Sequence, residues 1–266
     1  MIKTQIISVI NQKGGVGKTT TVINLAAGLA IQNKKVLIID LDPQGNATTG
    51  VGLSNTDSKD TIYEILTGDK EFKDAIKSTN VDNLKIVTAN VELSGLEVET
   101  ANDSKRAFFL KEKVDRFLKE NNNEFSYIFI DCPPSLSLLT VMSLVVSHSL
   151  IVPLQTEFFA LEGLTQLMKT IERIKDRLNS NLDIRGILLT MFDKRNKLSS
   201  QVETEARSFF KEKVYKTIIP RNVRLSEAPS HGTPVLVYDK NCPGSKSYFS
   251  FVNEFVDQDK FLESAA

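Results

Sequence analysis

A glycine-rich run near the N-terminus combines the residue types that bind a polyphosphate. The letters KGGVGKT occupy residues 13–19, between an apolar segment, Ile6–Ile10, and a segment with helical spacing. Glycines allow backbone N–H groups to converge on phosphate oxygens, and the helix that follows adds the positive end of its dipole. In such a loop the lysine reaches the β- and γ-phosphates, and the hydroxyl that follows it ligates Mg²⁺. The run therefore predicts a phosphate-binding loop in which Lys18 and Thr19 have these two roles.

Two further segments place carboxylates at the ends of apolar runs. Asp40 and Asp42 lie in LIIDLDPQGN, and Asp131 lies in YIFIDCPPS. In an open parallel sheet, ligands bind outside the carboxyl ends of the strands. Three carboxylates gathered there would repel one another, and a bound Mg²⁺ would relieve that repulsion. Turn formation with Pro43 and Gly45 is the alternative interpretation of Asp40 and Asp42, but the nearby glycine loop favours a magnesium site.

The elements that would position these residues alternate between strand and helix along the chain. Apolar runs without polar alternation are typical of parallel strands that are covered on both faces. Such runs occupy Ile6–Ile10, Val36–Ile39, Leu84–Val87, Tyr127–Ile130, Leu150–Leu154, Ile184–Met191 and Val214–Ile219. Helical spacing occupies Thr20–Ile31, Lys105–Lys119, Ser137–Val146, Glu162–Leu178, Ser199–Lys211 and Ser245–Ala266, and Thr61 with Glu64 resembles a capping box. We predict a single α/β domain over residues 1–266, doubly wound, with a mostly parallel sheet, helices on both faces and an irregular loop at Arg221–Gly232.

The composition excludes several classes of protein. The chain has 266 residues, 33 of them basic and 33 acidic, and 41% are hydrophobic, which is typical of a globular protein and not of a disordered one. The two cysteines, Cys132 and Cys242, cannot build a disulfide framework, which indicates a reducing, cytoplasmic setting. Only two histidines are present, so a histidine-rich metal site is disfavoured.

Two segments raise the question of a membrane, and neither has the required pattern. Residues 132–156 carry no charged side chain but contain three prolines, whereas a spanning helix needs about 20 predominantly apolar residues. Residues 245–266 carry two basic and four acidic side chains, whereas a helix on a membrane surface has a basic polar face. We therefore predict no membrane partner and a terminal helix that packs on the core.

Six segments together resemble one family of ATPases. They are KGGVGKT, LDPQGNATTG, YIFIDCPPSLSLLT, PLQTEFFALEGL, GILLTMFDKR and IIPRNVRLSEAPSHG. These are similar to the motifs of the ParA/Soj family of chromosome- and plasmid-partitioning ATPases, in the deviant Walker A group that includes MinD. The resemblance runs from about residue 5 to about residue 256. The leading Lys13 is distinctive, and the general phosphate-loop pattern has glycine where Gln12 stands here.

The resemblance implies a nucleotide-sandwich homodimer that forms with ATP and hydrolyses it slowly to ADP and phosphate. Lys13 matches the signature lysine that reaches the phosphates of the partner subunit, a role similar to that of an arginine finger. Asp42 matches the carboxylate that positions the attacking water, so Lys13, Lys18 and Asp42 are the implied catalytic residues. Thr19, Asp40 and Asp131 match the residues around Mg²⁺. The implied nucleotide-binding residues are Gly14, Gly15, Val16, Gly17, Lys18, Thr19 and Thr20, with Met191 and Pro220 near the adenine.

A basic segment in the C-terminal third indicates contact with nucleic acid. Residues 193–224 carry nine basic and four acidic side chains, a net charge of +5 in a chain whose total is zero. Such a stripe binds phosphates without reading bases, although a solvated helix face has the same composition. By resemblance, Arg195 and Arg224 match residues used for non-specific double-stranded DNA, and a ParB-class centromere-binding protein stimulates hydrolysis. The resemblance thus implies a nucleoid-associated protein of the cytoplasm, without the N-terminal helix-turn-helix extension of larger plasmid members.

Functions of other classes remain open from the sequence alone. A MinD-like membrane-cycling ATPase shares the loop but would need a basic amphipathic C-terminus. A reductase similar to the nitrogenase iron protein would need paired cysteines that bridge an iron–sulfur cluster across a dimer, which Cys132 and Cys242 do not match. A metabolic ligase similar to dethiobiotin synthetase shares the phosphate loop and would need a separate substrate pocket.

Overall fold

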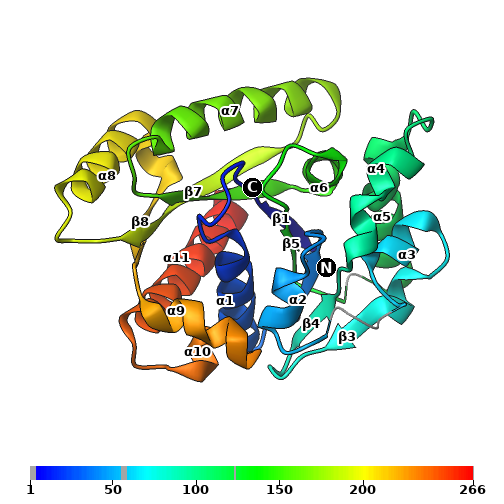
Figure 1. Cartoon of the computed structure of the whole chain (residues 1–266), viewed down its shortest axis with the longest axis horizontal. Coiled ribbons are helices and arrows are strands. Elements are labelled where there is room, and N and C mark those ends of the chain that lie inside the picture. Colours follow the sequence, from blue (N-terminus) through cyan, green and yellow to red (C-terminus); the bar gives the residue numbers. More distant parts are fainter. Residues whose placement is uncertain (1–3, 55–58, 123, 266) are drawn as a thin grey trace.

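An eight-stranded sheet runs through the computed structural model, which describes residues 4–54, 59–122 and 124–265 (Figure 1). The strands lie in the order β3-β4-β2-β5-β1-β6-β7-β8, and every neighbouring pair is parallel except β3 with β4. Their bounds are β1 Gln5–Val9, β2 Val36–Asp40, β3 Ile76–Ser78, β4 Leu84–Val87, β5 Tyr127–Asp131, β6 Ser149–Gln155, β7 Asp183–Phe192 and β8 Val214–Pro220. The predicted doubly wound, mostly parallel sheet is confirmed.

Helices cover both faces of the sheet, because successive side chains of a strand point to opposite faces. In β5, Ile128 and Ile130 pack in one apolar layer, whereas Tyr127 and Phe129 pack in the other. The first layer contains α3 (Ile62–Thr67), α4 (Leu96–Glu99), α5 (Phe109–Glu120), α6 (Leu138–Val146), α7 (Ala160–Arg177) and α8 (Lys197–Phe210). The second contains α1 (Lys18–Ile31), α2 (Asn46–Gly50), α9 (Val223–Glu227), α10 (Val235–Tyr238) and α11 (Pro243–Ala265). Figure 1 shows α7 and α8 on the side of the sheet opposite α1 and α11.

Local sequence signals set several element boundaries. The predicted capping box is confirmed at the start of α3: the Thr61 hydroxyl accepts from the Tyr63 amide at 3.2 Å, and the Glu64 carboxylate accepts from the Thr61 amide at 2.9 Å. The helix ends at Gly68, whose φ of 94° is left-handed and favours glycine. Short 3-10 helices lie at Phe72–Ala75, Val91–Ser94, Arg106–Phe108, Lys211–Lys213 and Ala228–His231.

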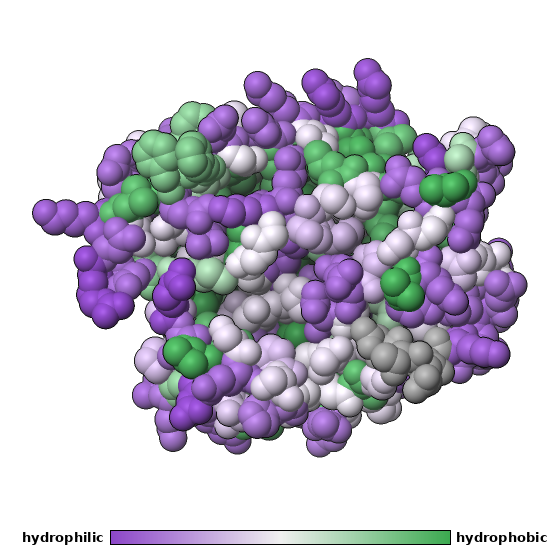
Figure 2. Space-filling model, in the orientation of Figure 1, coloured by the Kyte–Doolittle hydropathy of each residue, from purple (hydrophilic) through white to green (hydrophobic). Residues whose placement is uncertain are grey.

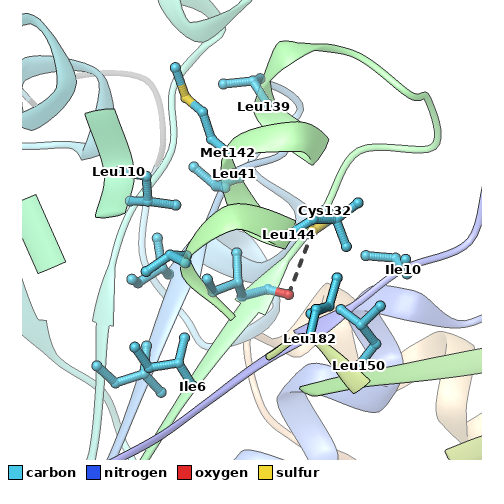
Figure 3. Close-up of a cluster of buried hydrophobic side chains, with 14 of the residues drawn as sticks. Ile6, Ile10, Leu41, Leu110, Cys132, Leu139, Met142, Leu144, Leu150 and Leu182 are labelled. Carbon is cyan, nitrogen blue, oxygen red and sulfur yellow. Dashed lines mark hydrogen bonds between the residues drawn. The ribbon is translucent and has the colours of Figure 1, made fainter. Parts of the chain in front are cut away.

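The apolar layer beneath the end of β5 encloses Cys132 (Figure 3). Its thiol lies 3.1 Å from the Ser143 hydroxyl and is surrounded by side chains such as Ile10 and Leu144. Burial raises the pKa of Cys132 to about 12, so the thiol stays protonated at neutral pH. Cys132 therefore behaves as a small core residue and not as a reactive thiolate.

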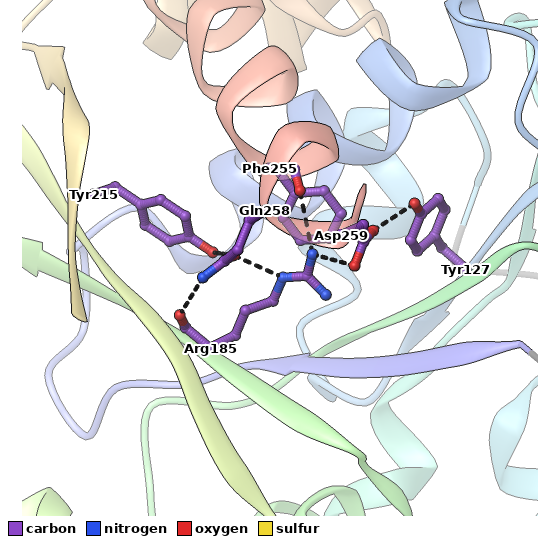
Figure 4. A network of polar contacts seen from close by, with 6 residues as sticks. All are labelled: Tyr127, Arg185, Tyr215, Phe255, Gln258 and Asp259. Atoms are coloured by element: carbon purple, nitrogen blue, oxygen red, sulfur yellow. Dashed lines mark hydrogen bonds and ion pairs between the residues drawn. The ribbon is translucent and has the colours of Figure 1, made fainter. Parts of the chain in front are cut away.

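The C-terminal helix α11 is fixed to the sheet by a buried polar network (Figure 4). The Arg185 guanidinium, on β7, donates to the Asp259 carboxylate at 2.5 Å and lies 3.8 Å from the centre of the Phe255 ring. The Tyr127 hydroxyl of β5 donates to the other Asp259 oxygen at 2.6 Å, and Gln258 accepts from the Arg185 Nε at 3.1 Å. The predicted packing of a terminal helix on the core is confirmed.

One sequence-based expectation about local structure is wrong. The segment Arg221–Gly232, predicted to be irregular, contains α9 and the 3-10 helix Ala228–His231, which ends at Gly232 with a φ of 59°. These helices are too short to produce a periodic apolar pattern, so the sequence gives no helical signal there. The sequence analysis also did not predict the antiparallel edge strand β3 or the helices α2 and α10, because each of these elements is likewise too short to produce a periodic pattern. Within the described ranges, no helix is both long and apolar enough to cross a membrane.

Candidate nucleotide site

The predicted phosphate loop joins the end of β1 to the start of α1. Gly15 and Gly17 have φ values of 74° and 92°, in the left-handed region that favours glycine. Gly17 is the N-cap of α1, and no side chain of a described residue caps the helix there. The first N–H groups of α1 are therefore left for a ligand, and the helix dipole favours an anionic one.

Lys18 is held inside this loop. Its side chain is buried, and its ammonium donates to the backbone oxygen of Lys13 at 3.1 Å. Burial lowers the pKa of Lys18, while the charges of Asp131 and Asp42 act in the opposite direction. The ammonium is thus positioned between the glycine loop and the acidic strand ends, where an anionic ligand would complete its charge balance.

The three predicted carboxylates meet at the carboxyl ends of β2 and β5. These strands are neighbours, with Asp40 opposite Asp131, and both side chains are fully buried. Asp40 accepts from the amide and hydroxyl of Thr48 at 2.8 Å each, and from the Asp42 amide at 3.1 Å. Burial raises the pKa of Asp40 to about 6. Asp40 therefore mainly orders the start of α2 and the backbone of Asp42.

Asp131 has a free acceptor atom. One carboxylate oxygen accepts from the Thr19 hydroxyl at 2.7 Å, whereas Oδ1 is buried without a hydrogen-bond partner among the described residues. Burial, with the nearby Asp40 charge as a second cause, raises the pKa of Asp131 well above its usual range. An unpartnered buried carboxylate oxygen indicates a missing donor or cation at that point.

These groups fit a magnesium ion that takes most of its ligands from elsewhere. Among the described residues, no group of three or more His, Cys, Asp or Glu side chains could hold a metal by itself. The Thr19 hydroxyl and the free oxygen of Asp131 are hard donors of the kind that Mg²⁺ or its bound water prefers. Mg²⁺ commonly keeps several waters and binds substrate phosphates, so a sparse set of protein donors suits it.

Two adjoining cavities extend from the phosphate loop. The first, of about 480 Å³, is called here the phosphate cavity, and its lining includes Lys18, Thr19 and Asp42. The second, of about 210 Å³, is called the adjoining cavity, and its lining includes Met191 and Pro220. The two share four lining residues, namely Gly17, Thr20, Met191 and Pro229. Their arrangement accommodates a chain of phosphates in one cavity and a base in the other.

The adjoining cavity contains a residue that the sequence analysis did not select. Asn222 lines it, and its Oδ1 is buried without a partner among the described residues. Met191, which lines both cavities, is a non-glycine residue with a φ of 52°. Backbone strain of this kind is concentrated at binding sites. Asn222 lies in the segment IIPRNVRLSEAPSHG, two residues after the predicted Pro220. Its polar side chain so close to Pro220 is the sequence feature that could have identified it.

The structure brings together only some of the predicted nucleotide residues. Gly14, Gly15, Gly17, Lys18, Thr19 and Thr20 all line the phosphate cavity. Val16 is buried beneath the loop, where its backbone oxygen accepts from the Thr190 hydroxyl at 2.8 Å. Lys13 is not among the described residues that line the phosphate cavity, and its ammonium forms an ion pair with Glu157, just after β6. Its side chain is 51% exposed, so it remains accessible from solvent.

The two predicted DNA-binding arginines are not among the described residues that line these two cavities, and both are paired with carboxylates. The Arg195 guanidinium forms a two-pronged contact with the Asp193 carboxylate, at 3.0 and 2.8 Å. Arg224, on α9, pairs with Glu227 at 2.7 Å and with Asp239 at 3.4 Å. Arg195 borders a third cavity that contains further basic residues, whereas Arg224 is not among its described lining residues.

An apolar patch lies on the same side of the molecule as Glu157. Figure 2 shows hydrophobic side chains gathered over the beginning of α7. Phe158 and Phe159, which follow Glu157, are 73% and 67% exposed, and Phe209 at the end of α8 is similarly exposed. Large exposed apolar patches mark sites of association with other molecules.

Comparisons with known proteins are consistent with this site. A family model described as an AAA domain matches residues 4–184. The chain is 46% identical to the chromosome partitioning protein ParA of Caulobacter vibrioides, over 98% of this chain and 97% of that protein. It is 48% identical to the sporulation initiation inhibitor protein Soj of Bacillus subtilis, over 94% of this chain and 97% of that protein. A solved structure of cobyrinic acid a,c-diamide synthase from Mycobacterium smegmatis, with bound ATP analog and magnesium, is similar with a TM-score of 0.83 and 32% identity, covering 97% and 96% of the two chains.

Proposed function

Because the chain belongs to the ParA/Soj family of chromosome-partitioning proteins, we propose that it is a DNA-segregation ATPase that uses ATP and Mg²⁺. The observation that carries this proposal is the arrangement of Lys18, Thr19 and Asp42 around one cavity that continues into a base-sized one. The proposed reaction is hydrolysis of ATP to ADP and phosphate. We propose that the chain forms a single ATPase domain.

The chain's own groups supply positioning and charge in this reaction. Lys18 lies where it can bind the β- and γ-phosphates, together with the N–H groups at the start of α1. Asp42, two residues after the end of β2, holds and orients the attacking water. Asp40 fixes the backbone of Asp42 by accepting the 3.1 Å hydrogen bond from its amide. Thr19 would hold Mg²⁺ directly, and Asp131 and Asp40 would act through its waters. When bound, the metal supplies charge neutralisation on the phosphate oxygens.

The position of Lys13 supports a reaction that needs two subunits. Its side chain points to Glu157 and not into its own phosphate cavity, and it is exposed at the rim. In a homodimer formed with ATP, Lys13 would contact the phosphates of the partner subunit and stabilise charge in the transition state. The exposed Phe158 and Phe159 directly follow Glu157, the ion-pair partner of Lys13, and would become buried between the subunits.

Steady-state phosphate release tests the assigned roles. Asp42→Ala should reduce turnover by about 100-fold or more, because an oriented water is lost, but should retain ATP binding and accumulate a dimer. Asp82→Ala, at an exposed loop position, is the matched control and should behave as wild type. Lys13→Ala should abolish turnover and weaken dimerisation, with Lys35→Ala as its exposed control. Normal turnover of Asp42→Ala would remove this residue from the mechanism.

The proposed cellular role requires DNA and a partner. The basic segment supports non-specific binding of duplex DNA, strengthened when dimerisation doubles the charged surface. A ParB-class centromere-binding protein would stimulate hydrolysis, and the protein would be associated with the nucleoid in the cytoplasm. We expect a random-sequence duplex to bind with ATP and Mg²⁺ and not with ADP at one fixed salt concentration. Equal binding with both nucleotides would separate DNA binding from the nucleotide cycle.

Two other functions share the same cavities. A MinD-like membrane-cycling ATPase is disfavoured by the acidic balance of residues 245–266. A metabolic ligase is suggested by the name of the Mycobacterium smegmatis structure, but its identity of 32% is lower than the 46% and 48% of the partitioning relatives. Absence of DNA binding with either nucleotide would favour these alternatives, and vesicle binding would then separate them.

A further inference from the structure

The short helix α2, which follows Asp42, has two faces with different surroundings. Asn46 and Thr49 are three residues apart, a spacing that places them on one face of a helix, and both line the phosphate cavity. Thr48 is fully buried and is not among the described residues that line this cavity. Thr48 is therefore placed to hold α2 against the sheet and not to contact a ligand in the cavity.

The hydroxyl of Thr48 makes two hydrogen bonds whose directions are fixed. The backbone amide of Ala89, in the loop after β4, donates to this hydroxyl at 3.1 Å. An amide can only donate, so the Thr48 oxygen is the acceptor there and its proton is directed to the Asp40 Oδ2, 2.8 Å away. The Thr48 amide donates to the same oxygen at 2.8 Å. Thr48 thus supplies two of the three donors that the structure shows on the Asp40 carboxylate.

These donors determine how the Asp40 carboxylate is oriented. Asp40 is fully buried, so protein donors take the place of water around it. With Oδ2 held by Thr48, Oδ1 accepts from the Asp42 amide at 3.1 Å. Asp42 is ordered further by the Gln44 amide, which donates to its Oδ1 at 3.0 Å, and by the Gly45 amide, which donates to its carbonyl at 2.8 Å. A continuous series of hydrogen bonds therefore joins the loop after β4 to the segment that carries Asp42.

We propose that Thr48 is a positioning residue for the ATPase reaction. Its hydroxyl holds the Asp40 carboxylate, which holds the backbone of Asp42 and so fixes the side chain that orients the attacking water. The inference rests on the proposed function and deepens it, because it assigns the precision of the Asp42 position to a residue outside the cavity. Thr48 acts through Asp40 and is therefore not a catalytic residue. The role needs a small side chain that both donates and accepts, which serine shares and valine lacks.

Steady-state phosphate release from the full chain, at varied ATP with Mg²⁺, tests the role of the hydroxyl. Thr48→Val keeps the shape of the side chain and removes the hydroxyl. Its kcat should fall about tenfold or more, because a small displacement of a positioning group is costly in rate. Its KM for ATP should stay within about twofold, because the cavity-lining face of α2 is unchanged. Thr48→Ser should restore kcat to within about threefold of wild type, since its hydroxyl can make both bonds.

Thr4→Val is the matched control. Thr4 is as buried as Thr48, and its hydroxyl donates to the Phe125 carbonyl at 2.7 Å, at the end of β1 opposite the phosphate loop. This variant should lower Tm as Thr48→Val does, and should leave kcat unchanged. Hydrogen exchange of the nucleotide-free protein gives a second readout. The Asp42 amide should exchange about tenfold faster in Thr48→Val, because its acceptor is loosened, and at the wild-type rate in Thr4→Val.

The outcomes separate the role of Thr48 from the proposed function. Normal kcat and normal Asp42 exchange in Thr48→Val, with Asp42→Ala inactive, would overturn the positioning role and leave the ATPase function intact. Equal losses of kcat in Thr48→Val and Thr4→Val would indicate a general effect of stability and would also exclude it, as would a change in KM alone. Thr48→Ala carries the same expectation if the valine variant does not fold. Absence of ATP hydrolysis by the wild-type protein would overturn the proposed function and this inference with it.

Discussion

Replacing Asp259 by asparagine should destabilise the protein far more than the same change two residues earlier. Asp259 pairs with the Arg185 guanidinium, and the two side chains are only 14% and 3% exposed (Figure 4). Asp257, on the same helix, pairs with Lys260 at 3.1 Å, and both of those side chains are about 70% exposed. The two substitutions remove the same charge from the same element, so burial is the main variable.

The expected loss follows from what remains around Arg185. Removing one member of a buried ion pair costs about 3–5 kcal/mol, because the other charge stays buried without compensation. Two neutral acceptors remain for the guanidinium, the Phe255 carbonyl at 3.2 Å and the Gln258 side chain at 3.1 Å. We therefore expect the lower end, about 3 kcal/mol, for Asp259→Asn. An exposed pair contributes about 0–1 kcal/mol, which sets the expectation for Asp257→Asn.

Urea denaturation followed by circular dichroism measures both losses, with thermal unfolding as a second assay. A change of about 3 kcal/mol corresponds to a decrease in Tm of about 6–12 °C for a chain of this size. An m-value equal to that of wild type would show that the comparison concerns folded stability. A loss below about 1 kcal/mol for Asp259→Asn, or one no larger than that of Asp257→Asn, would refute the assignment of a stabilising role to this network.

Three further results are expected at the nucleotide site. Glu157→Gln should free Lys13 and tighten ATP-dependent dimerisation by up to about fivefold, since a partly exposed ion pair contributes at most about 1 kcal/mol. Sedimentation at graded protein concentrations measures this, and weaker dimerisation would contradict it. Asn222→Ala should weaken ATP binding by about tenfold and narrow the preference for ATP over GTP, because its buried oxygen can accept from the adenine amino group. Calorimetry with both nucleotides tests this, and an unchanged preference would exclude Asn222 from base selection. Asp131→Asn should raise the free energy of unfolding of the nucleotide-free protein more at pH 8 than at pH 5. The raised pKa of Asp131 makes the folded state bind its proton more tightly than the unfolded state above about pH 4, so wild-type stability falls as the pH rises. Denaturation curves at both pH values would show a constant difference if this reasoning were wrong.

The sequence by itself determined the elements whose signals are local. The glycine loop, the apolar strands that end at Asp40 and Asp131 and the capping box at Thr61 depend on neighbours within a few residues. Backbone hydrogen bonding and side-chain periodicity operate over that range, so their patterns can be read directly. The doubly wound, mostly parallel class of fold also follows, because parallel apolar runs with helices between them have few ways to pack, whereas the order of the strands was not predicted.

The partners of individual charged and polar side chains were decided only by the tertiary structure. Lys13 and Glu157 are 144 residues apart in number, and Arg185 and Asp259 are 74 apart, yet each pair is in contact. No local pattern encodes such a contact, because it depends on how strands and helices are stacked in three dimensions. The same holds for the adjoining cavity, which Met191 and Asn222 both line although they are far apart in the sequence.

The basic residues illustrate the limit most clearly. The excess of positive charge in residues 193–224 is a property of composition, and the sequence predicted it without a structure. Which of these cations are free is a property of distance, since Coulomb attraction between a guanidinium and a carboxylate acts strongly only within a few ångströms. Arg195 and Arg224 proved to be paired, whereas Lys216 and Arg221 line a cavity and form no ion pair with a residue that the structure describes. The sequence thus determined that the surface is basic, and the folded chain decided which of its charges remain available to a ligand.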